Sequence, residues 1–303
     1  MCKIGFVGLG IMGAPMSLNL LKNKEHILFV HDTNPQTVKK IVAHGAKAAQ
    51  PAEIASKCDI VFLILPNGAV VRDVLFAGNG IARHMRKGSI VVDMSSVMPH
   101  DSIFCAQALA EYGVAFVDAP VSGGEPKAVD GTLAFMVGGA EQDFNRVYPL
   151  LLNMGASAVL VGKSGCGSIA KLVNQIIVNL TIAAVSEAFV FGVKAGAAPE
   201  KVYQAIRDGL AGSAVLDAKI PLILERNFIP GGKISINHKD IGNVLSTAHE
   251  IDSPVPLTSQ LFEIFQTMKA HGYMDLDHGF LVHYFEDLSG ITVGCGSEKG
   301  QAN

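Results

Sequence analysis

A single lysine interrupts an apolar stretch that is long enough to form a helix. Lys171 is the only formally charged residue between Ser164 and Ser186. On a helix, Asn174 and Gln175 follow it by three and four residues and share its face. An apolar surrounding disfavours the charged form of a lysine and moves its pKa toward the range that suits proton transfer. The pattern predicts Lys171 as a proton-transferring group with Asn174 as its partner, although a lysine that extends from a helix end into solvent has the same pattern.

Three small residues after a strand-like run form a second candidate site. In "VDAPVSGGEPKAVDGTL" (residues 117–133), the run leads into Ser122, Gly123 and Gly124. The backbone N–H groups of a glycine turn and one hydroxyl make a small concavity that suits a carboxylate. An ordinary surface turn uses the same residues. Ligands gather at the carboxyl ends of strands in open α/β sheets, so we expect this turn to bind a substrate carboxylate.

The glycine motif "GLGIMG" follows the first strand-like run directly. Gly8 permits a tight turn, Gly10 lets a pyrophosphate approach the backbone, and Gly13 lets the next helix pack closely on the strand. The helix start then offers N–H groups and the positive end of its dipole to the phosphates. Glycine-rich turns without a ligand are common, but an acidic residue after the next strand supports a dinucleotide site, which also includes Ile11 and Met12.

That acidic residue is Asp32, which ends the second strand-like run nineteen positions after Gly13. A carboxylate at this place accepts hydrogen bonds from the adenosine ribose. It would repel the 2′-phosphate of NADP, and no arginine follows at Thr33 or Asn34 to bind that phosphate. We therefore expect NAD(H) in preference to NADP(H). Alternatively, Asp32 caps the turn or helix that begins before Pro35.

The secondary structure expected to position these residues differs between the two halves of the chain. In the first half, short runs rich in β-branched residues alternate with helical patterns, which is typical of a doubly wound parallel sheet of the α/β class. The expected strands span residues 3–7, 27–31, 59–65, 89–94 and 114–119, with a further one at 133–139. From Ser164 onward, helical spacing covers residues 199–209, 215–225, 240–250 and 257–270. Pro221 is expected to kink or break the second of these helices.

The change in composition at residues 162–167 gives the expected domain boundary. We expect a Rossmann-like NAD-binding domain at 1–163, an all-helical domain at 164–293 and a flexible tail at 294–303. The apolar stretch at 164–186 has the length of a membrane span, but polar residues interrupt it too often. A helix buried inside a soluble protein fits it better.

The overall composition excludes several classes of protein. The chain has 303 residues, 49% of them hydrophobic, and its net charge of −3 gives no basic surface for nucleic acid or an anionic membrane. Its five cysteines are scattered without a Cys-x-x-Cys pair, which favours a reducing cytoplasm over a disulfide framework. His278 and His283 are too isolated to suggest a ligand set, and we expect no catalytic metal.

Six motifs, in this order, resemble the β-hydroxyacid dehydrogenase family: "GFVGLGIMGAPM", "LPN", "DMSS", "DAPVSGG", "GSIAKLVNQ" and "HKD". The resemblance covers nearly the whole chain except the tail. It implies that Lys171 is the catalytic lysine, that Asn174 assists it, and that the substrate carboxylate binds to Ser122, Gly123 and Gly124.

The same resemblance implies the architecture and extends the cofactor site. A long helix from near Gly167 would join the Rossmann-like domain to an all-α domain for substrate binding and dimerisation, in a homodimer or homotetramer. Pro66 and Ser96 would border the nicotinamide, next to Leu65, and Lys239 would reach into the same site. Many relatives have threonine in place of Ser96, and the shared hydroxyl keeps the expected role. Three residues are candidates for limiting substrate size through the resemblance alone: Gly212, Ser213 and Asp217.

Two longer stretches, "SGGEPKAVDGTLAFMVGG" and "AIRDGLAGSAVLDAKIP", are most similar to family members that act on tartronate semialdehyde (2-hydroxy-3-oxopropionate). The resemblance implies NADH-dependent reduction of this acid to glycerate, in glyoxylate metabolism, with a proton from Lys171. Within the family, the alternative is a dehydrogenase of 3-hydroxyisobutyrate or a related short hydroxy acid. Outside it, the alternative is a noncatalytic dinucleotide-binding sensor, but such a protein has no need for Lys171 and Asn174.

Overall fold

The computed structural model describes residues 2–78 and 80–294 and divides the chain into two compact units. The first unit ends at Leu172 and the second begins at Val173. This division lies inside the long helix α8 (Cys166–Lys194), beyond the change in composition at residues 162–167. The expected flexible tail lies, apart from Gly294, outside the described residues.

The first unit is built on one sheet. Its strands are β1 (Cys2–Val7), β2 (His26–His31), β3 (Lys47–Ala48), β4 (Ile60–Leu63), β5 (Ile90–Asp93), β6 (Ala115–Asp118), β7 (Val121–Ser122), β8 (Leu133–Gly138) and β9 (Gly155–Gly162). The strands β3-β2-β1-β4-β5-β6 are parallel and adjacent in this order, β8 continues the sheet antiparallel to β6, and β7 and β9 pair with β8. This is a doubly wound order, in which the direction of strand addition reverses between β1 and β4.

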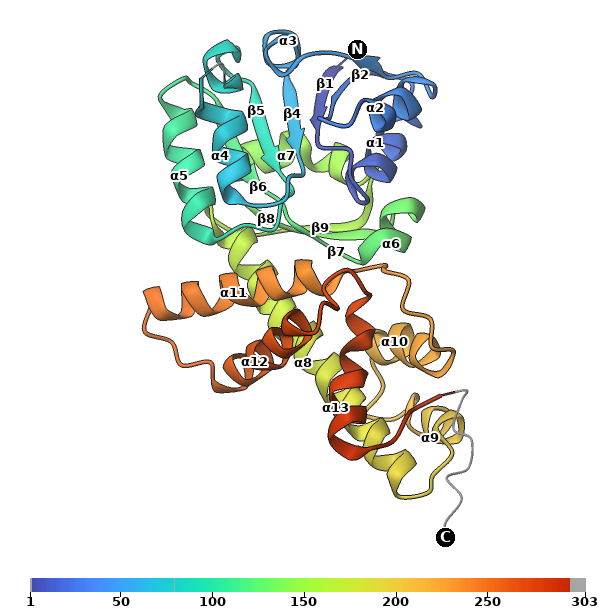
Figure 1. Ribbon diagram of the computed structural model, residues 1–303. Coiled ribbons are helices and arrows are strands. Elements are labelled where there is room, and N and C mark those ends of the chain that lie inside the picture. The colour runs from blue at the N-terminus through green and yellow to red at the C-terminus, as the bar shows by residue number, and fades with distance from the viewer. Residues whose placement is uncertain (1, 79, 295–303) are drawn as a thin grey trace. The chain divides into compact units, whose positions relative to one another are not determined.

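Helices cover both faces of the sheet (Figure 1). They are α1 (Gly13–Leu21), α2 (Pro35–Val42), α3 (Pro51–Lys57), α4 (Gly68–Phe76), the 3-10 helix η1 (Ile81–His84), α5 (Pro99–Ala110), α6 (Gly124–Asp130) and α7 (Glu141–Leu151). Ile4 and Phe6 of β1 pack in one buried core with Met16 of α1, whereas Val7 packs in a second core with Ile54 of α3. Successive strand residues point to opposite faces, so one apolar strand supplies both cores.

The predicted α/β fold with a doubly wound sheet is confirmed. Six strands, β1, β2, β4, β5, β6 and β8, lie within two residues of the expected ends. Three strands have no counterpart in the prediction. β3 and β7 are two residues long, and β9 is an edge strand with mostly exposed or half-exposed side chains, so its pattern lacks a clear apolar face.

The second unit is helical. Besides the later part of α8, it contains α9 (Pro199–Ile206), α10 (Ala214–Leu224), α11 (Ile234–Glu250), α12 (Pro256–Ala270), the 3-10 helix η2 (His278–Leu281) and α13 (Val282–Ser289). Pro221 was expected to kink or break α10. Helix α10 continues through Pro221, so a break there is wrong, and a kink stays a prediction. A proline removes one helical hydrogen bond, and the buried side chains of Ile220 and Ile223 hold the helix on both sides of it. Helix α11 begins earlier than expected because Ile234 and Asn237 extend its buried face.

Helix α8 is less buried than its composition predicts. By length and composition it could cross a membrane, and 39% of its most apolar window is buried in the structure. The buried stripe is partly polar and contains Ser168, Leu172, Gln175, Asn179, Ile182 and Ser186. The exposed positions include four large apolar side chains, Ile169, Val173, Ile177 and Phe191. Gln175 can point inward because it donates to Asp240, whereas Asn179 donates to the carbonyl oxygen of Gln175 on its own helix and its buried Oδ1 has no partner among the described residues. The exposed apolar face of α8 is left for a further contact.

Candidate functional site

Asp118 fixes the start of α8 to the sheet. It ends β6, it is 1% exposed, and its carboxylate accepts hydrogen bonds from the backbone N–H groups of Gly165 (2.8 Å) and Ser168 (2.9 Å). Burial raises the pKa of Asp118, and these N–H groups act in the opposite direction. The first N–H groups of a helix lack partners within the helix, so a carboxylate there satisfies them and interacts favourably with the helix dipole. The start of α8 is therefore held at the carboxyl end of β6.

Lys171 lies one turn further along α8, next to the glycine turn. Its Nζ donates a hydrogen bond to the backbone carbonyl oxygen of Val121 at 2.9 Å, and its side chain is partly buried. Val121 directly precedes Ser122, Gly123 and Gly124. Gly123 has a φ of +137°, a conformation that residues with a side chain rarely adopt. Within the first unit, the structure thus brings the predicted lysine to the turn predicted to bind a carboxylate.

In the second unit, Asn174 and Lys239 are joined through two buried polar residues. Asn174 Nδ2 donates to Gln175 Oε1 at 3.0 Å, and Gln175 Nε2 donates to Asp240 Oδ2 at 2.6 Å. Lys239 Nζ lies 3.0 Å from the other carboxylate oxygen, Asp240 Oδ1. Both predicted site residues of this unit are therefore oriented by one network whose centre is buried.

The loop after β1 has the geometry of a dinucleotide site. Gly8 has a φ of +98°, and a Cβ at this residue would overlap the carbonyl oxygen of Ile64. A Cβ on Gly13 would overlap the carbonyl oxygen of Gly8, so only glycine lets α1 start against the loop. A Cβ on Gly10 would meet no atom of the described residues within 4 Å, which leaves the backbone open to a ligand. Within the described chain no side chain caps the start of α1, where a phosphate would accept the N–H bonds.

Asp32 connects the end of β2 to this loop. Its Oδ2 accepts a hydrogen bond from Leu9 N at 2.6 Å, and its Oδ1 accepts one from Asn34 N at 2.7 Å. The side chain that caps α2 is that of Asn34, which accepts from Gln36 N at 3.0 Å. Asp32 therefore forms the turn before α2 without capping the helix. It also lies at the glycine loop, where this fold binds the ribose of a dinucleotide.

The loops after β4 and β5, which contain Leu65, Pro66 and Ser96, are bonded to each other. Leu65 N donates to Ser95 Oγ at 2.8 Å, and Ser95 N donates to Asp93 Oδ1 at 3.0 Å. Burial raises the pKa of Asp93 to about 6. Since β4 and β5 are parallel neighbours of β1 in the sheet, these loops leave it at the same edge as the glycine loop.

The two units contain different parts of the predicted site. The first unit has the residues Gly8, Gly10, Ile11, Met12, Gly13, Asp32, Leu65, Pro66, Ser96, Ser122, Gly123, Gly124 and Lys171. The second has Asn174 and Lys239. The prediction assigned no role to Asp93, Asp118 or Asp240, although each stands in a recognised motif. Asp93 and Asp118 could have been found from sequence, because each is a carboxylate at the end of an apolar strand and a buried charge requires a partner.

Two candidates for limiting substrate size have structural contacts of their own. Ser213 caps α10 through its hydroxyl. Asp217 accepts a hydrogen bond from the Tyr203 hydroxyl at 2.8 Å and lies 3.4 Å from Arg207 Nη2. These contacts give Ser213 and Asp217 a structural role in and around α10. Their role in substrate selection stays a prediction.

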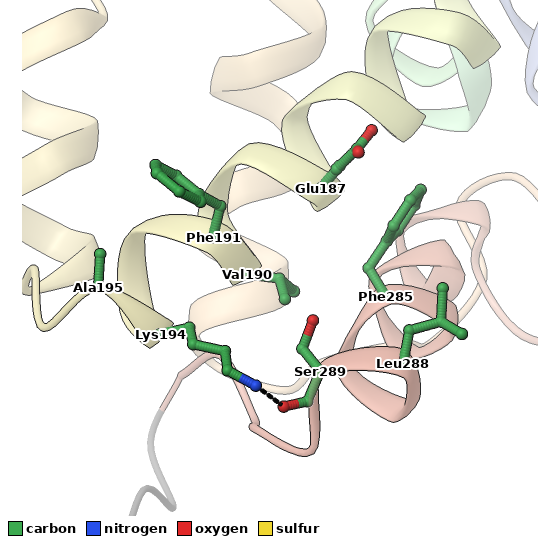
Figure 2. Close-up of a pocket in the computed structure, with 8 residues that line it drawn as sticks. All are labelled: Glu187, Val190, Phe191, Lys194, Ala195, Phe285, Leu288 and Ser289. Atoms are coloured by element: carbon green, nitrogen blue, oxygen red, sulfur yellow. Dashed lines mark hydrogen bonds between the residues drawn. The ribbon is translucent and has the colours of Figure 1, made fainter.

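A cavity of about 400 Å³ in the second unit lies between α8 and α13 (Figure 2). Its lining consists of Glu187, Val190, Phe191, Lys194, Ala195, Phe285, Leu288 and Ser289. The lining includes no predicted site residue and is mostly apolar, with Lys194 Nζ donating to the carbonyl oxygen of Ser289 at 2.6 Å. This cavity suits an apolar contact better than the chemistry of a hydroxy acid.

Models of two protein families match the chain in succession. The NAD binding domain of 6-phosphogluconate dehydrogenase matches residues 3–162. The model described as NAD-binding of NADP-dependent 3-hydroxyisobutyrate dehydrogenase matches residues 165–285. The first match contains the glycine loop and Asp32, and the second contains Lys171, Asn174 and Lys239.

Relatives of known activity match over nearly their full length. The 2-hydroxy-3-oxopropionate reductase of Escherichia coli (strain K12) is 41% identical over 285 residues, which are 94% of this chain and 97% of that protein. The 2-(hydroxymethyl)glutarate dehydrogenase of Eubacterium barkeri is 36% identical over 296 residues, 97% of this chain and 98% of that protein. A solved structure of 3-hydroxyisobutyrate dehydrogenase from Mycobacterium tuberculosis, with L-serine, is 29% identical with a TM-score of 0.86 and covers 93% of this chain and 98% of its own.

The matches and the geometry agree on the kind of chemistry. The two family models describe NAD-binding parts of dehydrogenases, and the relatives are a reductase and a dehydrogenase named for oxo or hydroxy acids. The lysine and the glycine loop of this chain lie in the matched segments. The protein is thus an oxidoreductase that acts on the CH–OH group of a small hydroxy acid, and it belongs to the β-hydroxyacid dehydrogenase family.

Proposed function

We propose that the protein reduces tartronate semialdehyde to glycerate with NADH. The observation that carries the proposal is the hydrogen bond from Lys171 to the carbonyl oxygen of Val121, which holds the ammonium beside the turn at Ser122–Gly124. A proton donor next to a carboxylate-binding turn fits a short acid whose aldehyde lies close to its carboxylate. The choice of this acid is supported by the 41% identical relative, whose name refers to the same compound.

Lys171 has two roles in the proposed reaction. NADH supplies a hydride to the aldehyde carbon, and the electron pair of the C=O π bond moves to the oxygen. The Lys171 ammonium donates a proton to that oxygen, and the amine regains a proton from solvent. Until the proton moves, the ammonium charge stabilises the developing negative charge. The Ser122 hydroxyl and the N–H groups of Gly123 and Gly124 orient the substrate through its carboxylate, and the chemistry requires no metal.

The residues around β1 fit NAD. The open backbone at Gly10 and the start of α1 suit the pyrophosphate, together with the loop residues Gly8, Ile11, Met12 and Gly13. Asp32 would bind the ribose and disfavour the 2′-phosphate of NADP. Four further residues would border the nicotinamide: Leu65, Pro66, Ser96 and Lys239. Because one matched family model is described as NADP-dependent, both dinucleotides have to be compared directly.

Oxidation of 3-hydroxyisobutyrate is the second candidate activity. It is favoured by the likeness to the Mycobacterium tuberculosis structure, with its TM-score of 0.86. The two aldehyde acids differ at the carbon next to the carboxylate, which has a hydroxyl in tartronate semialdehyde and a methyl group in methylmalonate semialdehyde. A site that binds the hydroxyl with a polar group rejects the methyl compound, because its own polar group then stays unpaired.

Initial rates of NADH and NADPH oxidation with tartronate semialdehyde, methylmalonate semialdehyde and glyoxylate separate these possibilities. We expect kcat/KM to be highest for NADH with tartronate semialdehyde and lower by about tenfold or more with the methyl compound. A preference for methylmalonate semialdehyde would assign the protein to the second candidate activity. A preference for NADPH would contradict the role of Asp32.

The exposed face of α8 supports a homodimer or homotetramer, which we also propose. Ile177, Ala184 and Phe191 are spaced by seven residues on α8, and the Phe191 side chain is 74% exposed. Glu187 and Lys194 are also seven residues apart and line the cavity beside Phe191 (Figure 2). This exposed apolar seam fits a second copy of the chain.

A charged substitution in this seam is expected to separate the subunits. Phe191→Glu buries a charge in the proposed contact, so it should give a monomer in size-exclusion chromatography with light scattering, while the wild-type protein is a dimer or tetramer. Leu210→Glu is the matched control, because Leu210 is fully exposed and lies outside α8, and it should leave the mass unchanged. A monomeric wild type, or an unchanged mass for Phe191→Glu, would exclude this contact.

We assign cofactor binding to residues 1–163, and substrate selection and subunit contacts to residues 164–293. We further propose a cytoplasmic enzyme whose partners are small carboxylate-bearing aldehydes or hydroxy acids, without nucleic acid or membrane. The scattered cysteines and the net charge of −3 support this location and these partners.

A further inference from the structure

Asp240 is a buried carboxylate with two different donors. It lies in α11 and is 1% exposed. Its Oδ1 is 3.0 Å from the ammonium of Lys239, and its Oδ2 accepts a hydrogen bond from Gln175 Nε2 at 2.6 Å. An ionised carboxylate can only accept hydrogen bonds, so the group that faces Oδ2 must be a donor.

This requirement fixes the direction of the Gln175 amide. The nitrogen of Gln175 has to face α11, where Asn237 Oδ1 is a second acceptor at 3.4 Å. The Asn237 amide is oriented in turn, because its Nδ2 donates to the carbonyl oxygen of Lys233 at 3.0 Å. With its nitrogen facing two acceptors, Gln175 presents Oε1 on its other side.

The direction of Gln175 then fixes that of Asn174. Asn174 Nδ2 donates to Gln175 Oε1 at 3.0 Å, and an amide that donates on one side has its carbonyl oxygen on the other. Asn174 therefore keeps Oδ1 as a hydrogen-bond acceptor. The proposed reaction has two donors that an acceptor at Asn174 suits: the Lys171 ammonium and the substrate hydroxyl. Lys171 precedes Asn174 by three residues on α8.

We propose that Asp240 and Gln175 are positioning residues that set the hydrogen-bond polarity of Asn174 in the reaction. Because Asp240 can only accept, Gln175 must donate its Nε2 hydrogen to Asp240. Gln175 then accepts from Asn174 Nδ2, which leaves Asn174 Oδ1 as an acceptor on the side away from Gln175. The inference rests on the proposed function of Asn174, but it is independent of which short hydroxy acid is the substrate.

With almost no change in volume, Asp240→Asn is expected to reverse the bonds between residues 240 and 175 and between residues 175 and 174, at the cost of the 3.4 Å contact of Gln175 with Asn237 Oδ1. Lys239 is only a donor, so the new amide at position 240 turns its oxygen to Lys239 and its nitrogen to Gln175. Gln175 then accepts with Oε1 and donates to Asn174, whose own nitrogen becomes the outward group. We expect kcat/KM to fall by about 10- to 100-fold, as for other changes that disorient a catalytic group through a neighbour. Asp252→Asn, an exposed change of the same type, is the control and should leave the rate unchanged.

A second substitution should restore the lost activity. In Asp240→Asn with Asn174→Asp, Gln175 donates to the carboxylate introduced at position 174, and the other carboxylate oxygen is again an outward acceptor. Alone, Asn174→Asp places two acceptors face to face at Gln175 and lowers the rate. The double variant has the net charge of the wild type and should be at least tenfold faster than either single variant. Loss of the Lys239 contact, or a simple loss of packing, gives no such recovery.

Rates are measured with the acid that the wild-type enzyme uses best, and thermal unfolding confirms that each variant is folded. If the double variant does not fold, a double-mutant cycle of Asp240→Asn and Asn174→Ala replaces it. The losses in kcat/KM of the two single variants should then be far from additive in the combined variant. An unchanged rate for Asp240→Asn, an additional loss in the double variant, or additive losses in the cycle would overturn the inference. A wild type that prefers another hydroxy acid contradicts only the proposed substrate, because the same comparisons apply to that acid.

Discussion

Replacement of Lys171 by methionine is expected to lower kcat by about 10²- to 10⁴-fold, the usual contribution of a general acid or base. The KM for NADH should stay close to that of the wild type. Methionine has a similar apolar chain, so the packing of α8 changes little, but both the proton and the positive charge are lost. In the wild-type protein the hydrogen bond to the carbonyl oxygen of Val121 holds that charge beside the glycine turn. Initial rates of NADH oxidation at saturating substrate measure the change.

The control for this variant is Lys163→Met, which changes an exposed lysine shortly before α8. We expect this change to leave kcat unchanged. Equal rates for Lys171→Met and the wild type would show that another group transfers the proton. The proposed roles of the glycine turn and of Asn174 would then lose their basis.

Asp118→Ala is expected to lower the free energy of unfolding by about 3 kcal/mol, since buried N–H groups lose their acceptor. The carboxylate of Asp118 accepts from Gly165 N and Ser168 N at the start of α8. Burial raises the pKa of Asp118 by opposing its charged form. We therefore expect the loss of stability to arise from the unpaired N–H groups, not from removal of the charge. The rate should fall too, because Lys171 is one turn from the anchored residues. Urea denaturation and steady-state rates measure the two effects.

Asp130→Ala provides the comparison for this loss of stability. Asp130 is exposed at the end of α6, and a surface change of this kind usually alters stability by less than about 0.5 kcal/mol. Asp118→Asn should lie between the two, because an amide oxygen replaces one of the two acceptors. If Asp118→Ala unfolds at the same urea concentration as the wild type, Asp118 does not anchor α8.

The glycine loop could be predicted from sequence because its requirements are local. Within six residues, Gly8 forms the tight turn, Gly10 leaves the backbone open, and Gly13 lets α1 approach the loop closely. The strands could also be predicted from sequence, because each forms a short apolar run whose side chains supply both cores of the sheet. Lys171 was recognisable for a related reason: a charge in an apolar helix needs a use or a partner.

The polar partners could not be predicted, because they come from distant parts of the chain. Asp118 meets the start of α8 about fifty residues later, and Asp240 meets Gln175 across 65 residues. The buried face of α8 was equally hard to predict, because its buried stripe contains Gln175 and Asn179 while Ile177 is exposed. Residue type alone predicts the opposite arrangement. For Gln175, the difference is explained by its buried hydrogen bond to Asp240, and Ile177 belongs to the uncovered apolar face.

Transfer of deuterium from NADH to the product measures the proposed reaction itself. NADH deuterated at both C4 positions of the nicotinamide would be incubated with the enzyme and tartronate semialdehyde, and the product analysed by NMR and mass spectrometry. We predict glycerate with one deuterium on the former aldehyde carbon, formed rapidly by the wild type and very slowly by Lys171→Met. Glycerate without deuterium, or no glycerate while another short aldehyde acid is reduced, would contradict the assignment.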